Sequence, residues 1–488
     1  MIKRMRAIAL ILIVSLLSLG GRIFYIAYYN ADTASVSGSA HAEYYGSRRG
    51  LIFDRNLQQL VETQKVKKYS QINPAFSFEV PERYAVDQLC PHLIGYTDAE
   101  NNGVSGIEKD YNSFLKAIPN RLLIKTYKDA RGNTLKGKGT VIDTSESCTN
   151  SGIALTIDKN IQSVVQTAGK RLGSGAIVVM RSDSGEIEAM ASFPTYNPKD
   201  IASALKNGDK PLINRALCLY NVGSVFKSIV CLAALESGVS PAFSYSCNGK
   251  TVCGGTVFHC HKEDGHGSVD MKKALAFSCN TYFIALAQYI GYEKILEMCR
   301  RFELDEAITL SQSIMAAAGN LPKKEDLASP AAVANLSFGQ GQLLASPLSL
   351  CRIYAAIHNG GSLVTPQLVF GEVKNGNISA QSSSQSKPII RKQYADSVME
   401  FLTCAVSHGT GRSAAVKNCA VAGKTATAQT GKYTGSKEKL ISYFIGLISV
   451  KGDKYTILVM RENGTSGSAD CAPIFKEICE KIQAQKKE

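Results

Sequence analysis

The strongest signal in this sequence is the stretch Val222-Gly223-Ser224-Val225-Phe226-Lys227, which opens a helical pattern over residues 224–237. Residues three apart share one face of a helix, so Ser224 and Lys227 are predicted to stand side by side. A serine hydroxyl becomes nucleophilic when a neighbouring base takes its proton, and a lysine whose pKa is lowered by burial can be that base. A helix start also directs free backbone N–H groups at a developing oxyanion. By itself, however, an S-x-x-K stretch is common in ordinary amphipathic helices.

Two later segments strengthen the signal. Ser278-Cys279-Asn280 lies between two helical patterns, and Lys424-Thr425-Ala426-Thr427 lies in a strand-like run over 421–429. The triplet S-x-x-K, S-x-N and K-T-G, in this order, is typical of penicillin-binding proteins and serine β-lactamases. We therefore expect the three segments to meet in one catalytic cleft.

The resemblance extends over nearly the whole chain and is closest to the class B penicillin-binding proteins. No glycosyltransferase-like module precedes the catalytic segment in this sequence, which favours class B over class A. The N-terminal part is compact, as in the short A-type and sporulation-type branches. The segments that resemble class B are residues 48–56 (RRGLIFDRN), 103–111 (GVSGIEKDY), 155–158 (LTID), 185–191 (GEIEAMA) and 338–341 (FGQG).

The resemblance implies a peptidoglycan D,D-transpeptidase. Ser224 would attack the penultimate D-alanine carbonyl of a stem peptide, and an amine of a neighbouring stem would resolve the acyl-enzyme. Lys227 would be the base for acylation, while Ser278 and Asn280 would relay a proton and hold the substrate amide. β-Lactams would acylate the same serine, and no cofactor is implied.

The third motif would bind the substrate. Lys424, Thr425 and Thr427 would hold the terminal carboxylate, and the backbone N–H groups of Ser224 and Thr427 would form the oxyanion hole. Ala426 departs from the family, which usually has glycine there, and its methyl group could crowd the ligand. We expect an altered rate or drug affinity rather than loss of activity.

The pattern along the chain predicts an α+β fold, with an antiparallel sheet flanked by helices. Paired strands are expected at 176–180 and 187–190, helical patterns at 224–237, 270–291 and 345–358, strands at 441–450 and 454–460, and a closing helix at 472–484. The expected layout is a cytoplasmic tail (1–6), a transmembrane helix (7–28), an N-terminal pedestal module (29–150) and a penicillin-binding transpeptidase domain (151–488).

The N-terminal residues predict where the protein is located in the cell. Basic residues precede an apolar stretch long enough to span a membrane, which indicates an uncleaved single-pass anchor with the catalytic domain outside the cytoplasm; the alternative is a cleaved signal peptide. The net charge of +14 suits the cytoplasmic membrane and an anionic wall polymer, and no nucleic-acid-binding motif accompanies it. The expected partners are stem peptides on lipid-linked precursor, β-lactams and, by resemblance, a polytopic glycan polymerase.

The fourteen cysteines do not resemble a disulfide scaffold. Cysteines and histidines cluster between residues 247 and 266, but their spacing matches no standard zinc pattern, so no metal site is expected. Because Cys279 lies inside the second motif, bonding it to a partner would move two catalytic side chains. We therefore consider a redox switch through Cys260 and Cys279, with a plain buried thiol as the alternative.

Three other functions share part of this evidence. A β-lactamase or β-lactam sensor has the same triplet, a D-alanine carboxypeptidase differs only in using water to resolve the acyl-enzyme, and a non-catalytic morphogenesis scaffold would explain Ala426. Arg48, Asp54 and Arg55 are predicted to form structural ion pairs where the N-terminal module meets the catalytic domain, with binding of substrate or a partner as the alternative.

Overall fold

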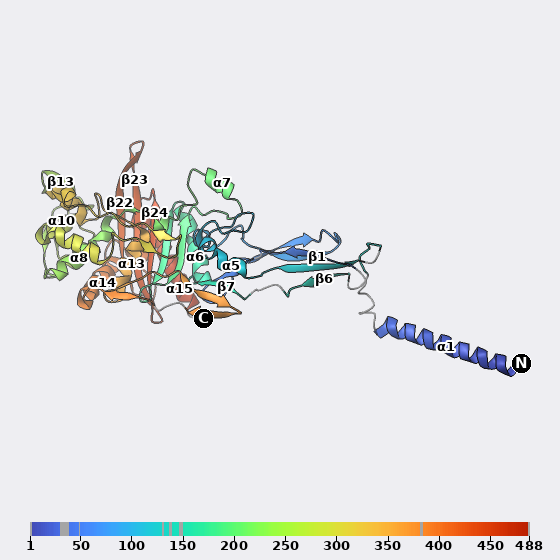
Figure 1. The fold of residues 1–488 in the computed structure, drawn as a ribbon. Helices are drawn as coiled ribbons and strands as arrows, with labels where there is room; N and C mark the ends of the chain where they lie inside the picture. Colours follow the sequence, from blue (N-terminus) through green and yellow to red (C-terminus); the bar gives the residue numbers. More distant parts are fainter. Residues whose placement is uncertain are drawn as a thin grey trace. The chain divides into compact units, whose positions relative to one another are not determined.

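The computed structural model describes residues 2–29, 39–47, 49–128, 131–135, 139–145, 150–380 and 384–486 (Figure 1). By their packing, the residues form two compact units. The first comprises residues 1–49, 64–83 and 119–149, and the second comprises 50–63, 84–118 and 150–488. The last change of unit lies between residues 149 and 150, one residue before the expected boundary at 150/151. Residues 50–63 and 84–118, expected in the N-terminal module, pack with the second unit.

Within the residues described above, the first unit contains helix α1 (Ile2–Tyr29) and five strands. Within α1, Arg4–Tyr25 has a mean hydropathy of 2.3 and no buried residue, so this apolar helix fits a single-pass membrane anchor. A three-stranded antiparallel sheet is formed by β1 (Ser39–Tyr45), β5 (Leu122–Lys128) and β6 (Thr140–Asp143). A separate hairpin of β3 (Gln64–Tyr69) and β4 (Ser77–Glu82) contributes Phe78 and Val80 to a small core around Ile124.

The second unit is built on a five-stranded antiparallel sheet in the order β22-β23-β24-β8-β9. Its strands are β22 (Val421–Thr434), β23 (Lys437–Val450), β24 (Asp453–Glu462), β8 (Gly175–Arg181) and β9 (Ile187–Phe193). Successive residues of a strand face opposite sides, and in β8 both sides are buried: Ile177 and Val179 join one core cluster, and Val178 joins the other. The α+β prediction is confirmed, with early strands completing a sheet made of late ones.

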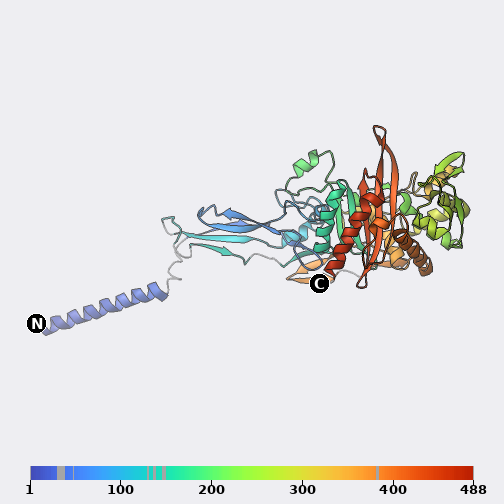
Figure 2. The same ribbon diagram turned by 180° about the vertical axis from the view of Figure 1, so that it is seen from behind.

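Helices cover both faces of this sheet. In Figure 2 the C-terminal helix α15 (Ala472–Gln485) crosses one face, where it packs beside α6 (Lys159–Gly169). The other face is covered by α13 (Pro347–His358), in front of the sheet in Figure 1, together with α8 (Lys227–Glu236) and α14 (Lys392–Ser407). The predicted helices at 345–358 and 472–484 are confirmed.

The helical pattern over 270–291 is broken in the structure. Helix α9 (Met271–Ala276) ends before Phe277, and α10 (Asn280–Ile290) begins after Cys279. Ser278 between them has φ +56°, a left-handed backbone conformation that residues other than glycine rarely adopt. The break therefore lies within the second motif.

The remaining elements of this unit are short. They include a sheet of β2 (Leu51–Phe53), β7 (Gly152–Leu155), β19 (Val369–Lys374) and β20 (Asn377–Ala380), and the strand pairs β10 (Tyr220–Asn221) with β17 (Leu344–Ala345), β15 (Ile308–Thr309) with β16 (Met315–Ala316) and β18 (Ser362–Val364) with β21 (Ser386–Pro388). The other helices are α3 (Pro91–Ile94), α4 (Gly106–Asp110), α5 (Asn112–Ala117), α7 (Ile201–Lys206), α11 (Tyr292–Arg301) and α12 (Pro330–Ser337).

Arg55 forms ion pairs inside the second unit, with Glu186 at 2.9 Å and with the buried carboxylate of Glu188. Asp54 accepts hydrogen bonds from backbone N–H groups, including that of Lys159 at 3.1 Å. For these two residues a structural role is consistent with the contacts. Arg48 lies outside the described residues.

Candidate active site

One pocket of about 330 Å³ is lined by residues of all three sequence motifs. Its lining residues are Ser224, His261, Ser278, Asn280, Thr410, Thr425, Ala426, Thr427, Ser466, Gly467 and Ser468. The two predicted lysines, Lys227 and Lys424, are fully buried and do not line it. The structure thus gathers segments that lie about two hundred residues apart in sequence.

Ser224 lies on a 3₁₀ turn, η4 (Gly223–Phe226), which continues directly into α8. The expected α-helix therefore begins later, at Lys227. In a 3₁₀ turn residues three apart are aligned, so the turn still presents Ser224 and Lys227 on one side. Gly223, at φ +66°, donates its N–H to Gly339 O at 2.7 Å, and this bond anchors the chain immediately before Ser224.

The Lys227 amine is held by the second motif. Its Nζ donates to Ser278 O at 2.8 Å and to Asn280 Oδ1 at 2.6 Å, and it lies 3.1 Å from Ser278 Oγ. Burial lowers the pKa of Lys227 to about 8, because a charged ammonium loses its hydration there. A neutral amine has two N–H donors for the two oxygen acceptors, which leaves its lone pair for a hydroxyl proton.

The second motif is fixed from two sides. Cys279 caps the start of α10, and its N–H donates to Ala274 O at 2.9 Å. Asn280 Nδ2 donates to His259 O at 3.1 Å, which turns the amide oxygen toward Lys227. The left-handed Ser278 between α9 and α10 is a constrained conformation of the kind found at functional sites.

The third motif lies on β22, the edge strand of the sheet. Lys424 Nζ donates to Thr425 O at 2.9 Å, and burial, together with the charge of Lys227, lowers the pKa of Lys424. Thr425 Oγ1 is 2.7 Å from Thr410 Oγ1. Ala426 is only 3% exposed and belongs to the apolar core cluster with Ala428, so its methyl group packs mainly against the core.

Sequence reasoning missed five of the lining residues: His261, Thr410, Ser466, Gly467 and Ser468. Thr410 lies in Gly409-Thr410-Gly411, a pattern that by itself predicts only a turn. Gly467 belongs to the short π-helix η7 (Gly467–Cys471), and a Cβ there would lie 2.0 Å from Tyr443 O and 2.8 Å from Ala426 O. This close approach brings the 466–468 wall against β22, and no local pattern indicates it.

Cys260 and Cys279, the predicted redox pair, lie next to this pocket as free thiols with their sulfur atoms 4.0 Å apart. Their position beside the second motif agrees with the sequence analysis. The switch itself remains a prediction.

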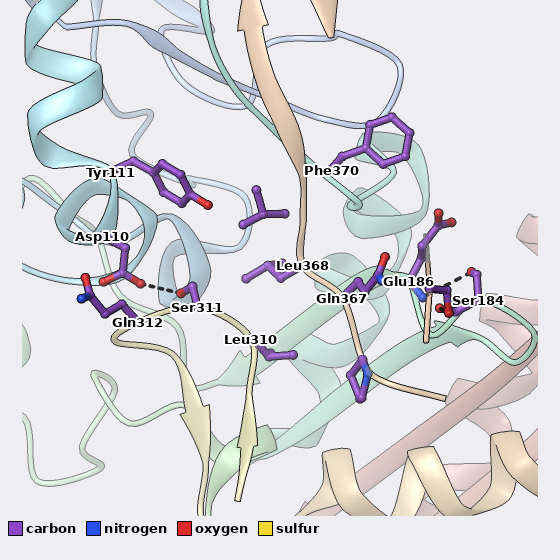
Figure 3. A pocket seen from close by; sticks show the side chains of 13 residues that line it. Asp110, Tyr111, Ser184, Glu186, Leu310, Ser311, Gln312, Gln367, Leu368 and Phe370 are labelled. Atoms are coloured by element: carbon purple, nitrogen blue, oxygen red, sulfur yellow. Dashed lines mark hydrogen bonds between the residues drawn. The ribbon is translucent and has the colours of Figure 1, made fainter. Parts of the chain in front are cut away.

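A second cavity, of about 580 Å³, lies away from the three motifs (Figure 3). The carboxylate of Asp110 is used within its wall, where it accepts hydrogen bonds from Ser311 Oγ and from the backbone N–H of Ser313. Another wall carboxylate, Glu186, is paired with Arg55. The acidic side chains of this second cavity are therefore engaged in structural contacts, and we place the candidate active site in the smaller pocket.

Two relatives by sequence carry a peptidoglycan-transpeptidase name and a sporulation name. The chain is 28% identical to the peptidoglycan D,D-transpeptidase FtsI of Buchnera aphidicola over 416 residues, covering 82% of this chain and 69% of the relative. It is also 28% identical to the stage V sporulation protein D of Bacillus subtilis over 417 residues, covering 81% of this chain and 62% of the relative.

Solved structures with a similar fold include a D,D-transpeptidase domain and a penicillin binding protein. The D,D-transpeptidase domain of a peptidoglycan glycosyltransferase from Eggerthella lenta matches with a TM-score of 0.70 at 26% identity, over 90% of this chain and 98% of that one. Penicillin binding protein 3 of Mycobacterium tuberculosis, complexed with aztreonam, matches with a TM-score of 0.70 at 25% identity, over 91% and 97%. A chain of a peptidoglycan synthase complex for polymerisation and crosslinking shares the fold, with a TM-score of 0.72 at 22% identity over 99% and 98%.

The profile of the penicillin binding protein transpeptidase domain matches residues 175–480, well over half of the chain and the whole of the three-motif pocket. The chain therefore belongs to the penicillin-binding protein transpeptidase family, in common with the peptidoglycan D,D-transpeptidases that it resembles in sequence.

Proposed function

We propose that this chain carries out the D,D-transpeptidase reaction of its family through an acyl-enzyme on Ser224. The observation that carries the proposal is the environment of Lys227. Its buried amine faces two oxygen acceptors and a hydroxyl, beside a pocket that Ser224 also lines. A buried amine whose pKa is lowered to about 8 is a suitable general base near neutral pH.

In the acylation step, Ser224 Oγ attacks the penultimate D-alanine carbonyl while its proton passes to the neutral Lys227. The peptide bond to the terminal D-alanine then breaks. The leaving amine takes a proton that travels from Lys227 through Ser278 Oγ, which lies 3.1 Å from Nζ. The products are the ester on Ser224 and free D-alanine, so atoms and protons balance.

In the second step, an amine of a neighbouring stem peptide attacks the ester carbonyl. Lys227 accepts a proton from this amine, the bond to Ser224 Oγ breaks, and the proton returns to the serine. A new peptide crosslink forms, and the enzyme is regenerated. Water in place of the amine would give the carboxypeptidase product, so the balance depends on which nucleophile the pocket admits.

The third motif is proposed to position the substrate. Thr425 and Thr427 line the pocket from the edge strand β22, along which an extended stem peptide can lie as an added strand. Lys424 is proposed to supply positive charge for the terminal carboxylate, with backbone N–H groups of Ser224 and Thr427 as the oxyanion hole. Burial lowers the pKa of Lys424 and so disfavours its charged form, but a charged Lys424 would attract a bound carboxylate strongly because the local dielectric is low.

The proposal is tested by labelling the full-length protein with a fluorescent penicillin. We expect a stable covalent adduct that maps to Ser224, none in Ser224→Ala, and normal labelling in Ser237→Ala, an exposed serine at the end of α8. The absence of an adduct in a folded wild type would contradict the proposal and favour the scaffold alternative. Rapid turnover of a chromogenic β-lactam would favour a β-lactamase, and release of D-alanine without crosslinks in the presence of acceptor would favour a carboxypeptidase.

We further propose that α1 is an uncleaved anchor with the catalytic unit outside the cytoplasm, and that 29–150 acts as a pedestal for the transpeptidase domain at 151–488. The apolar helix near the N-terminus supports the anchor, and three basic residues in its first turns favour a cytoplasmic start. Protease added to the outside of unlysed spheroplasts should then digest the catalytic domain. Protection of the whole chain would contradict this topology.

Because the fold also matches a chain of a peptidoglycan synthase complex, we propose a polytopic glycan polymerase as the partner. Co-purification of such a polymerase with the detergent-solubilised chain tests this. Its absence from crosslinked membrane complexes would contradict it.

A further inference from the structure

Four side chains with metal-binding atoms converge beside the active site. Cys247, Cys260, His266 and Cys279 each place one donor atom so that all four lie within 4.8 Å of one another. His266 Nδ1 is 3.6 Å from Cys247 Sγ and 3.4 Å from Cys260 Sγ, and the sulfur atoms of Cys260 and Cys279 are 4.0 Å apart. The three cysteines are buried, and His266 is half-buried.

The distances of 3.4, 3.6 and 4.0 Å are close to the edges of a tetrahedral zinc site. With Zn–S bonds of about 2.3 Å and a Zn–N bond of about 2.0–2.1 Å, the edges of the tetrahedron are about 3.8 Å between sulfurs and about 3.6 Å between sulfur and nitrogen. A disulfide would need the two sulfurs at about 2.05 Å, and it would leave two further donors converging on the same point without a role. Three thiolates and one imidazole are a donor set that suits zinc.

Strand register explains how these residues meet. In the hairpin-like pair of β11 (Tyr245–Cys247) and β14 (Gly267–Val269), Cys247 lies opposite Gly267, which follows His266. Cys260 donates its backbone N–H to Gly249 O at 2.7 Å, two residues after Cys247. Gly265, at φ +75°, has no room for a side chain, since a Cβ would lie 2.1 Å from Cys247 O. Cys279 completes the group from the start of α10.

The segment from β11 to β14 (residues 245–269), here called the insert, has little core of its own. Its other two strands, β12 (Lys250–Cys253) and β13 (Thr256–His259), carry mostly exposed or half-buried side chains, among them Val252 at 67% exposure. Small segments that bury few apolar groups usually depend on a metal or a disulfide for stability. The remaining cysteine of the insert, Cys253, points elsewhere, with its sulfur 3.2 Å from Pro330 O.

We propose that this chain binds one Zn²⁺ through Cys247, Cys260, His266 and Cys279, as a closed site that stabilises the insert and the second catalytic motif. Its link to catalysis rests on the proposed function. Cys279 lies between Ser278 and Asn280, both of which contact Lys227 Nζ. His259, whose carbonyl holds the Asn280 amide, directly precedes Cys260. The metal would therefore fix both ends of the contact that orients the base.

The first test is the metal content of the full-length protein, purified in detergent without chelators. We expect about one zinc per chain, in keeping with a single four-donor site. Cys247→Ser should lose most of the metal, whereas Cys253→Ser, the matched control in the same insert, should keep it. Metal-free wild type with four free donors, a Cys260–Cys279 disulfide in mass mapping, or iron in place of zinc would overturn the proposal.

A second measurement covers the case in which Cys247→Ser does not fold. Wild type loaded with Co²⁺ should show thiolate-to-metal charge-transfer bands and the strong visible bands of tetrahedral cobalt. A weak octahedral spectrum without a thiolate band would overturn the site.

The catalytic link is tested by stripping zinc from the wild type and restoring it. Penicillin acylation should slow at least about tenfold and recover with Zn²⁺, as for groups that position catalytic residues. An unchanged rate in metal-free protein would refute the link. The two proposals fail separately: zinc bound without any penicillin adduct contradicts the transpeptidase function, and an adduct on a chain that never binds metal contradicts the zinc site.

Discussion

The pH dependence of acylation provides the sharpest test of Lys227 as the base. Only the neutral amine can accept the Ser224 proton, and burial lowers the Lys227 pKa from 10.5 to about 8. Acylation should therefore rise with pH and level off above about pH 8. At pH 7 about one tenth of the amine is neutral, against about 0.03% for a lysine with an ordinary pKa. Burial thus increases the reactive fraction by about 300-fold at neutral pH.

The assay is the second-order acylation rate constant with a fluorescent penicillin, measured by rapid quench from about pH 6 to about pH 10, where the protein remains folded by circular dichroism. The expected profile has a slope of one below the midpoint and a plateau above it. Lys227→Arg, whose guanidinium stays charged, should react at least about 100-fold more slowly at the plateau, and its rate should no longer rise with pH around the midpoint. His261→Gln changes an ionisable side chain that, unlike Lys227, lines the pocket, and this variant should keep the wild-type pH dependence.

A flat profile would refute the reasoning, because the base would then be neutral throughout or absent. A rate that climbs without a plateau up to pH 10 would also refute it, since the amine would then titrate like an exposed lysine. If the rise of the acylation rate with pH disappears in His261→Gln, the base would be that histidine and not Lys227.

Three other changes follow from the same contacts. Gly339→Ala should destabilise the fold by at least about 2 kcal/mol in urea unfolding and slow acylation, because φ is +78° there and the new methyl would lie 2.2 Å from Gly223 O, next to the nucleophile; unchanged values would contradict this. Arg55→Met should cost about 2 kcal/mol in the same assay but leave Ser224 labelling of the folded protein intact, since Glu188 loses one partner and keeps Arg181 at 3.5 Å; loss of labelling in folded protein would argue for a functional role. Ala426→Gly should lower stability by about 1–2 kcal/mol and change acylation less than about threefold, because the methyl group packs mainly in the core; a large gain in rate would mean that it crowds the ligand instead.

Much of the catalytic centre was predictable because it consists of short local patterns. The spacing of Ser224 and Lys227 follows from one helical turn, and the motifs around Ser278 and Lys424 are recognisable in order along the chain. The prediction that these segments meet agrees with the pocket, which they line together. Buried strands such as β8 and β23 were predictable for a similar reason, since runs of apolar residues bounded by turns have few other solutions.

What local pattern could not decide was the backbone where the motifs act. The helical pattern over 270–291 continues through Phe277 and Cys279, yet the chain breaks there, because Ser278 adopts a left-handed conformation between α9 and α10. The wall formed by Ser466 and Gly467 was likewise invisible, since it depends on close backbone approach to β22.

The sequence alone therefore determined which residues are candidates for the chemistry, because the proposed nucleophile, its proposed base and the order of the motifs lie in short contiguous segments, where helical and strand periodicities apply. Only the tertiary structure decided how Cys247, Cys260, His266 and Cys279 relate. Their spacing matches no standard zinc pattern, because the donors come from different strands, a loop and a helix start. Strand register and tight glycine turns, which are long-range properties of the packed chain, bring their donor atoms within 4.8 Å of one another.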